Sequence, residues 1–250
     1  MNMNVPPVNS GTIAPLRNVT AMVTLATTLL DRPAHSSSGF GVMSGPSGYG
    51  KTVASTYTVN KLNALYVEVR SFWRAKTFCE ALLRELEREP KGTVAAMMEE
   101  ITYVLGSSSG RVLIIDEADK LVDKGMIELA RDIQEMTSAP VILVGEELLP
   151  KKLQRYERVH NRVLTWALAE PSDLDDTRTL AGILCPHVDL ADDLLAKIVS
   201  LTGGRTRRIA NTLHEIGLRA KMEGRSDYDA ASYSGPIETG EAPVRGRRSA

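Results

Sequence analysis

The stretch Gly45-Pro46-Ser47-Gly48-Tyr49-Gly50-Lys51-Thr52 fits the pattern GxxxxGK[ST] at every fixed position. A short apolar run, Phe40–Met43, precedes it and predicts a strand, and Lys51–Leu62 can continue as a helix. Glycines in such a turn let backbone N–H groups converge on phosphate oxygens, and the helix start adds its positive end. A chance glycine-rich turn is the alternative, but the position between a strand and a helix argues against it. The stretch therefore predicts a phosphate-binding loop.

Two side chains of this loop have the chemistry that a nucleoside triphosphate needs. Lys51 is expected to neutralise charge on the β- and γ-phosphates of ATP, and the Thr52 hydroxyl is expected to bind Mg²⁺. The cofactors predicted from the loop are therefore ATP and Mg²⁺. We expect the nucleotide to contact the whole loop and the residue after it, namely Gly45, Pro46, Ser47, Gly48, Tyr49, Gly50, Lys51, Thr52 and Val53.

A second motif lies at Val112–Asp119, where the sequence is VLIIDEAD. The aliphatic residues predict a strand buried on both faces of a parallel sheet, which carries Asp116 to the carboxyl end, where ligands of open α/β folds bind. There Asp116 can hold Mg²⁺, directly or through water, and Glu117 can polarise the attacking water as the catalytic base. Two solvated carboxylates in a loop are the alternative, which the preceding aliphatic run disfavours. For Asp119, a cap or a salt bridge is as consistent with the pattern as chemistry.

Strands and helices alternate over the first two thirds of the chain. Further strands are predicted at Leu65–Val69, Val141–Val144 and Val163–Leu168. This alternation predicts an α/β fold with a mostly parallel sheet, and five strands are expected in all. The helices are expected at Pro15–Leu30, Lys51–Leu62, Ala75–Glu89, Thr93–Leu105 and Met126–Met136.

The composition changes after Pro171, where strand-like runs stop and three helices are expected. We divide the chain into a flexible lead-in at 1–14, a nucleotide-binding α/β domain at 15–170, and a small all-helical lid domain at 171–224. Residues 225–250 are rich in Ser, Gly, Pro, Asp and Arg and have few aliphatic residues, so a disordered tail is expected there.

Composition bounds the class of protein. Of 250 residues, 43% are hydrophobic and 24% charged, as in ordinary soluble domains, and the formal net charge is −1. A balanced charge gives no overall nucleic-acid signature, so any such binding must come from local patches. Cys79 and Cys185 are far apart and fit no metal spacing, which favours free thiols in a reducing compartment. No signal peptide or membrane-spanning run is recognised, and we expect a cytoplasmic protein without a membrane partner.

The pair GPSGYGKT and VLIIDEAD resembles the motifs of an AAA+ ATPase, and the resemblance covers about residues 15–224. It implies a P-loop NTPase fold, which is a three-layer sandwich with a parallel five-stranded sheet in the order 5-1-4-3-2, followed by a small helical lid. It also implies ATP sites at the junctions between subunits of a homo-oligomer. The enzyme class implied is a Mg-dependent ATPase.

The resemblance also implies two arginine roles. Residues 203–211, GGRTRRIAN, are similar to the second sensor of the lid, which places a γ-phosphate contact at Arg207, with Arg208 as the neighbouring substitute. A solvated, basic helix start is the alternative. Arg155, Arg158 and Arg162 lie where the family has its trans-acting arginine finger, and Arg158 or Arg162 is favoured. The three could equally form one exposed helix face.

One segment departs from the family pattern. The fourth strand of an AAA+ domain usually ends on a polar sensor such as Asn, Thr or Ser, whereas this chain has Val144-Gly145-Glu146-Glu147. Either Glu146 orients water, or hydrolysis is slow without a partner. The departure affects expectations about turnover and not about binding.

Within AAA+ proteins, the run VEVRSFWRAKTFCEALLREL looks like the branch of the phage Mu B, TnsC and TniB-type transposition regulators. That resemblance implies a bacterial or bacteriophage protein that assembles as a ring or filament on duplex DNA and activates a transposase. Without a helix-turn-helix before the loop, non-specific DNA contacts are expected from the ATPase domain itself. The best candidates are Arg70, Arg74 and Lys76, which surround Phe72 and Trp73, and Trp73 is expected to pack in the core or at a subunit contact. Lys120 and Lys124, after the acidic motif, are second-rank candidates.

Two other functions remain open. One is a remodeller of a protein partner, similar to helicase loaders or ExeA-like secretion ATPases, which would hydrolyse ATP without DNA. The other is a switch that binds ATP and turns it over negligibly. The basic tail segment Arg245–Arg248 is either a phosphate grip, a partner tether or a solvated terminus.

Overall fold

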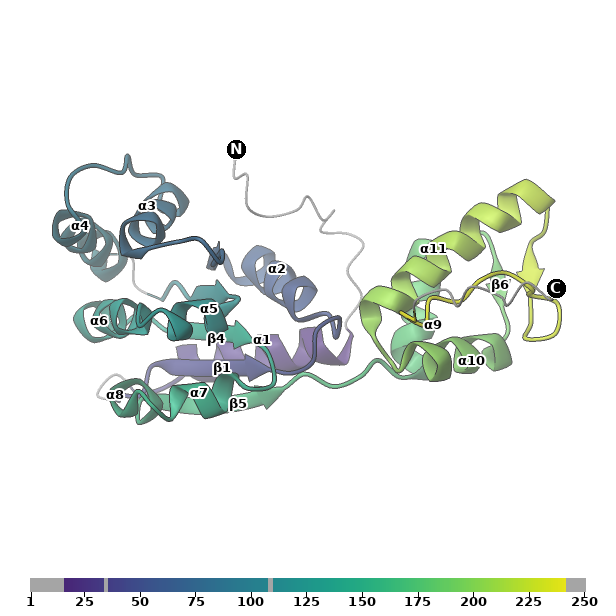
Figure 1. The fold of residues 1–250 in the computed structure, drawn as a ribbon, viewed down its shortest axis with the longest axis horizontal. Coiled ribbons are helices and arrows are strands. Elements are labelled where there is room, and N and C mark those ends of the chain that lie inside the picture. The colour runs from purple at the N-terminus through teal and green to yellow at the C-terminus, as the bar shows by residue number, and fades with distance from the viewer. Residues whose placement is uncertain (1–15, 34–35, 108–109, 242–250) are drawn as a thin grey trace, which may run out of the picture. The chain divides into compact units, whose positions relative to one another are not determined.

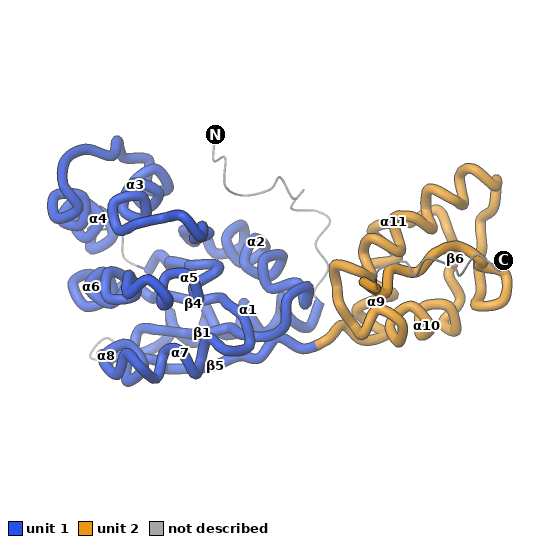
Figure 2. Tube along the Cα trace, in the orientation of Figure 1, with its two compact units in different colours: residues 1–170 blue, residues 171–250 orange. Residues whose placement is uncertain are grey.

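The computed structural model describes residues 16–33, 36–107 and 110–241, and the chain divides into two compact units, Met1–Glu170 and Pro171–Ala250 (Figure 2). The expected lead-in at 1–14 and the residues 242–250 lie outside the described part of the chain. In that part, no helix combines the length and the apolar character needed to cross a membrane.

The first unit is built on a parallel five-stranded sheet in the order β2-β3-β4-β1-β5 (Figure 1). Read from the other edge, this is the order 5-1-4-3-2 that the AAA+ resemblance implies. The expected strand order is therefore confirmed. The strands are β1 (Phe40–Ser44), β2 (Leu65–Glu68), β3 (Leu113–Asp116), β4 (Val141–Gly145) and β5 (Val163–Leu168).

Helices cover both faces of the sheet, so the unit has three layers. On one side lie α1 (Arg17–Leu30) and α2 (Lys51–Leu62), which contact each other and strands β1, β2, β3 and β5. The opposite layer contains α3 (Ala75–Glu85), α4 (Val94–Ser107), α5 (Ala118–Asp123), α6 (Ile127–Thr137), α7 (Leu149–Leu153) and α8 (Glu157–His160).

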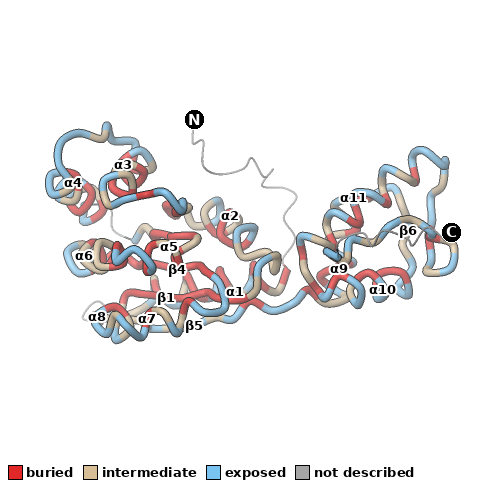
Figure 3. The backbone as a smooth tube through the Cα atoms, viewed as in Figure 1, coloured by how far each residue is buried: buried red, intermediate tan, exposed pale blue. Residues whose placement is uncertain are grey.

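The central strands are buried from both sides because a helical layer lies on each face (Figure 3). Val42 and Leu143 pack into the core beneath α3–α7. Successive side chains of a strand alternate between faces, so Gly41 faces the other layer, where a Cβ would come within 2.5 Å of Leu25 on α1. The same alternation places Asp116 on the face of Ile114, because the two residues are two apart in one strand.

The second unit contains α9 (Leu174–Leu184), α10 (Asp192–Thr202) and α11 (Thr206–Glu223) around a separate core that includes Leu194, Ile209 and Leu213. It also contains a short parallel pair, β6 (Asp189–Leu190) and β7 (Asp227–Tyr228). The expectation of an all-helical lid is therefore wrong in this detail. A two-residue strand leaves no periodic pattern that could predict it.

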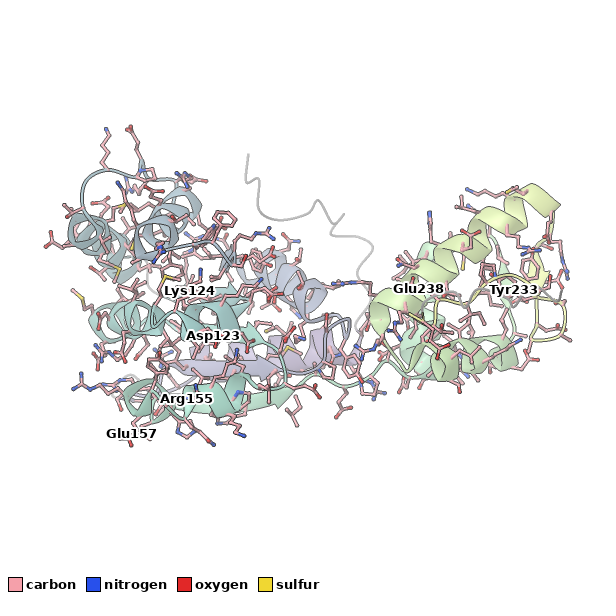
Figure 4. All side chains as sticks on the ribbon, in the orientation of Figure 1. Asp123, Lys124, Arg155, Glu157, Tyr233 and Glu238 are labelled. Atoms are coloured by element: carbon pink, nitrogen blue, oxygen red, sulfur yellow. The ribbon has the colours of Figure 1, made fainter. Side chains whose placement is uncertain are left out.

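The expectation of disorder after residue 224 is wrong for residues 225–241. Tyr228 and Tyr233 are buried in the core of the second unit, and the backbone N–H of Glu238 donates to the hydroxyl of Thr212 on α11. Figure 4 labels Tyr233 and Glu238 on this segment. Two aromatic side chains supply the apolar anchors here, whereas the sequence interpretation looked for aliphatic residues. Cys79 and Cys185 are both free and buried.

Candidate active site

The phosphate-binding loop connects the end of β1 to the start of α2. Gly48 and Gly50 have φ values of 88° and 79°, a left-handed backbone that favours glycine. The Lys51 ammonium donates hydrogen bonds to the carbonyl oxygens of Gly45 at 2.6 Å and Pro46 at 2.9 Å. Burial lowers the pKa of Lys51, and the negative charge of Asp116 is the largest opposing influence. The structure thus holds this cation against the loop.

Asn18 on α1 ties the loop to the end of β5, a role that the sequence interpretation missed. Its side-chain amide donates to the carbonyl oxygens of Tyr49 and Glu170, each at 2.7 Å, and its amide oxygen accepts from the N–H of Glu170 at 2.9 Å. Asn18 is 5% exposed. A polar residue on the apolar side of a predicted amphipathic helix was the signal that could have found it.

Asp116 is the centre of the acidic strand end and is almost completely buried. Its Oδ2 accepts hydrogen bonds from the Thr52 hydroxyl at 2.9 Å and from the Tyr66 hydroxyl at 3.0 Å. Its Oδ1 accepts from the N–H of Glu117 at 2.8 Å. Burial raises the pKa of Asp116, and these three hydrogen bonds oppose the rise. The structure therefore brings together Thr52 and Asp116, which the sequence analysis paired as metal ligands.

The donor set at this point fits Mg²⁺. A hydroxyl oxygen and a carboxylate oxygen lie side by side, and oxygen ligands are what this hard cation prefers. Thr52 and Asp116 would hold the ion, directly or through water. Tyr66 is a further residue that sequence reasoning missed, although a tyrosine in an otherwise aliphatic strand beside the acidic motif was a usable signal.

Glu117 adopts a left-handed backbone, with φ 56° and ψ 38°, at the start of α5. A non-glycine residue in this region is uncommon and turns the chain sharply after β3. Its carboxylate is partly exposed and lies 3.1 Å from the Lys120 ammonium. Lys120, predicted as a DNA contact, thus pairs in this structure with the candidate base.

The candidate arginine fingers differ in their surroundings. Arg162 contacts Glu135 on α6 and donates to the carbonyl oxygen of Arg158 at 2.6 Å, so it holds two elements of its own subunit together. Arg155 and Arg158 are exposed, and the ion pairs found among the described residues include neither of them. The geometry favours Arg158 over Arg162 as a residue free to reach another molecule.

Arg207 lies in the first turn of α11 and is exposed. Arg208, the neighbouring substitute, lies where a Cβ on Gly240 would come within 2.1 Å of its guanidinium. Because Arg207 belongs to the second unit, its sensor role stays a prediction.

The segment between β2 and α3, together with the first turn of α3, carries the other predicted DNA contacts. Arg70, Arg74 and Lys76 are exposed, and Phe72 between them is 77% exposed. Trp73 is 9% exposed and packs into the core of the first unit, as expected for a packing residue. The Lys124 ammonium donates to the carbonyl oxygens of Ser71 and Trp73, so the exposed loop is anchored from α5.

Comparison with protein families gives a match within the first unit. Residues 34–153 match the model of the AAA domain family AAA_22. This part of the chain is similar to an AAA domain. The match includes the phosphate-binding loop, the acidic strand end and β4, and it is consistent with the predicted enzyme class, an ATPase. Comparison with the curated proteins gives no match.

Solved structures share the fold of this chain. Cdc6p from Pyrobaculum aerophilum is 17% identical with a TM-score of 0.65, over 89% of this chain and 66% of that chain. The ORC1 protein from Aeropyrum pernix, solved in complex with DNA, is 18% identical with a TM-score of 0.63, over 88% and 64%. The ORC2 protein from Aeropyrum pernix, in an ADP form, is 16% identical with a TM-score of 0.68, over 90% and 68%. The chain thus spans slightly less than two thirds of the first two structures.

Proposed function

We propose that this protein binds ATP with Mg²⁺, assembles as a homo-oligomer on duplex DNA with little sequence preference, and regulates transposition by acting on a transposase. The observation that carries the DNA-binding part is the segment of residues 70–76, which is the loop after β2 and the first two residues of α3. It presents three exposed cations and an exposed aromatic ring on an anchored backbone. The fold shared with an ORC1 protein that was solved in complex with DNA supports the same reading.

The anchoring matters because an exposed apolar side chain on a mobile loop would cost free energy to order on binding, and its contacts would be unspecific. Here Trp73 fixes one side of the loop in the core, and Lys124 bonds to two of its carbonyl oxygens. Arg70 pairs with Glu68 at 2.7 Å and stays half exposed, so it can exchange that partner for a phosphate. Phosphate contacts of this kind position a protein on DNA without reading its sequence.

The residues of the site would divide the work of hydrolysis. Lys51 would bind and orient the β- and γ-phosphates, and Thr52 and Asp116 would hold a metal ion, which would supply positive charge to the phosphates. Glu117 accepts a proton from the attacking water. Arg207 of the same chain and Arg158 of the next subunit would add positive charge at the γ-phosphate. Hydrolysis would then reset the assembly on DNA.

The role in transposition rests on the resemblance of residues 67–86 to the Mu B, TnsC and TniB-type regulators. Co-sedimentation with random-sequence duplex DNA in ATP, in ADP and without nucleotide tests the DNA-dependent assembly that this role needs. We expect ATP-selective pelleting. Pelleting that is equal in all three conditions, or absent from all three, would contradict the proposal.

A matched pair of variants tests the loop itself. Replacing Arg70, Arg74 and Lys76 together by Ala should weaken binding and reduce the slope of log K against log salt by about 2 to 3, since each lost phosphate contact removes about one unit. The control replaces Arg84, Arg88 and Lys91 by Ala, which removes the same charge from exposed positions at the other end of α3 and beyond it. An equal loss in both variants would show that net charge matters and the loop does not.

A second candidate function is the remodelling of a protein partner, and one surface favours it. Leu164, Trp166 and Leu168 project from the same face of β5 and are 39%, 43% and 73% exposed. In the described sheet β5 pairs with β1 alone, so it is an edge strand with a free side. ATP hydrolysis at full rate without DNA would favour this function over the first.

A further inference from the structure

Asp119 is buried in the first turn of α5, but its carboxylate serves other elements. Its Oδ2 accepts a hydrogen bond of 2.6 Å from the N–H of Glu146, directly after β4. Its Oδ1 lies 3.4 Å from the ammonium of Lys152 on α7, an ion pair without hydrogen-bond geometry. An acid in the first turn of a helix is usually explained by the helix dipole. That explanation does not suffice here because both oxygens contact groups outside α5.

The contact explains why the fourth strand ends on glycine. A Cβ on Gly145 would lie 2.2 Å from Asp119 Oδ2 and 2.7 Å from a methyl group of Leu149. Any larger residue would push the carboxylate off the end of β4. The polar side chain that AAA+ proteins usually carry at this point is therefore sterically excluded in this chain.

Lys152 extends the same connection. Its ammonium also lies 2.7 Å from Asp123, one helical turn beyond Asp119 on α5. The chain continues from α7 to Arg155 and then to α8, which carries Arg158. Figure 4 labels Asp123 on α5 and Arg155 between α7 and α8. The buried carboxylate of Asp119 thus connects three elements of the unit. These are α5, which begins after Glu117, the end of β4, and α7, which precedes Arg155 and Arg158 in the chain.

The position of Glu146 links the Asp119 contacts to ATP turnover. Glu146 is exposed, and its negative charge acts on Lys51, where it opposes the lowering of the pKa of that ammonium. Gly145, directly before Glu146, pairs across the sheet with Ser44, the residue directly before the phosphate-binding loop. Glu146 therefore follows a strand end that lies beside the loop, and its N–H donates to Asp119.

We propose that Asp119 is a positioning residue for ATP hydrolysis, which fixes the Gly145–Glu146 turn against the helix that carries Glu117 and so holds the Glu146 carboxylate beside the phosphate-binding loop. The proposal rests on the ATP site described above. Asp119 contacts neither the loop nor Thr52, so it should affect the rate of the chemical step more than the affinity for nucleotide.

Four variants test this in the full chain, with kcat and nucleotide Kd measured for each. Asp119→Ala should lower kcat roughly 10- to 100-fold, the range expected for a misplacement of about 1 Å. Its Kd for nucleotide should stay within about twofold. Asp119→Asn keeps an acceptor for the Glu146 N–H and should restore most of the rate. Gly145→Ala should reproduce the loss because its Cβ displaces the carboxylate. The control, Asp123→Asn, removes the other partner of Lys152 and should leave kcat nearly unchanged.

The Asp119→Ala, Gly145→Ala double variant should be no slower than either single one, because both changes remove the same contact. If Asp119→Ala does not fold, Asp119→Asn and Gly145→Ala still carry the test. A wild-type kcat in Gly145→Ala, an Asp119→Asn no faster than Asp119→Ala, or a Kd that rises in step with the loss of kcat would overturn the proposal. Lys51→Ala and Glu117→Gln are measured in parallel. If those two variants keep ATP turnover, the assignment of the ATP site itself is wrong. That outcome is distinct from a failure of the role proposed for Asp119.

Discussion

The Tyr66 hydroxyl donates a 3.0 Å hydrogen bond to Oδ2 of Asp116, so the edge strand β2 directly supports the acidic end of β3. The same oxygen accepts from Thr52 on α2. Asp116 therefore has two hydroxyl donors from two different elements, both on the face of the sheet that α1 and α2 cover. Both favour the ionised carboxylate, which is the form that can hold a metal ion.

Removing the Tyr66 hydroxyl should move the pH dependence of the reaction. Burial raises the pKa of Asp116 and the Tyr66 hydrogen bond opposes this, so Tyr66→Phe should raise that pKa further. The acidic limb of the kcat/KM profile should shift to higher pH, with a several-fold loss below the shifted limb and recovery above it. Tyr57→Phe, at a tyrosine on α2 that the site does not use, serves as the control. Superimposable profiles for wild type and Tyr66→Phe would refute the assigned role.

Asp116 should also lower the stability of the nucleotide-free protein. Because burial raises its pKa, the folded state holds the proton more tightly than the unfolded state. The ionised carboxylate therefore lowers the free energy of unfolding above its ordinary pKa of 3.8, and the full penalty is reached above the folded pKa. Asp116→Asn should abolish turnover and raise stability at pH 8 by about 1 kcal/mol, or ~2–4 °C in Tm.

The gain from Asp116→Asn should shrink as the pH falls, since wild-type Asp116 then becomes neutral in both states. Thermal melts of the two proteins at a series of pH values, from about 4 to about 8, check this. The most acidic condition lies close to the pKa of the carboxyl group in the unfolded chain. A gain that is constant over the whole range would show that ionisation of Asp116 is not its cause.

Asn18 offers a prediction about the loop. Asn18→Ala would leave the Tyr49 and Glu170 carbonyl oxygens and the Glu170 N–H without this buried partner. An unsatisfied buried group costs about 1–3 kcal/mol, and these hydrogen bonds are partly buried, so a loss of stability of about 1–3 kcal/mol is expected in all. Affinity for ATP should also fall, since Tyr49 belongs to the phosphate-binding loop. Asn60→Ala, at an exposed asparagine on α2, is the control and should change neither quantity.

The sequence predicted most of the fold because long periodic segments carry a strong signal. The helix at Lys51–Leu62 and the strand at Val163–Leu168 have the predicted bounds, and the order of the strands follows from the two motifs and the family they resemble. The end of α3 was placed too late because Glu87 adopts a left-handed φ of 57°, a local conformation that no propensity predicts. The short β6–β7 pair and α5, α7 and α8 were missed since they span too few residues for a periodic pattern.

The site shows a similar limit. Loop glycines, Lys51, Thr52, Asp116 and Glu117 were found because they are close in the sequence to recognisable motifs. Asn18, Tyr66 and the contact between Asp119 and Gly145 depend on segments that meet only after folding. The unexpected glycine at the end of β4 was noticed as a departure, but its cause lies in a carboxylate from another helix.

The exposed face of β5 leads to a prediction about assembly. Trp166 is 43% exposed and lies near His160 on α8, the helix that carries Arg158, with tilted rings whose centroids are 5.6 Å apart. If subunits meet through this face, Trp166→Ser should reduce the ATP-dependent oligomer seen by sedimentation velocity while the monomer keeps its Tm. Tyr103→Ser, at a tyrosine on α4 that is 70% exposed, is the matched control. Equal oligomer content in all three proteins would exclude the β5 face as a subunit contact.

Substitutions of Arg158 and Arg162 should have different effects. Arg158 is exposed, so Arg158→Ala should leave Tm and ATP binding unchanged but lower turnover in the assembled protein by a factor of about 10³ or more, as for loss of an arginine finger. Arg162 contacts Glu135 and the Arg158 carbonyl, so Arg162→Ala should lower Tm instead.

A mixing experiment decides whether Arg158 acts on the ATP site of a neighbouring subunit. Combining Arg158→Ala with Lys51→Ala protein should restore part of the turnover, because some interfaces then join an intact loop to an intact arginine. Two inactive proteins that stay inactive when mixed, although they co-assemble, would show that Arg158 does not serve a neighbouring site.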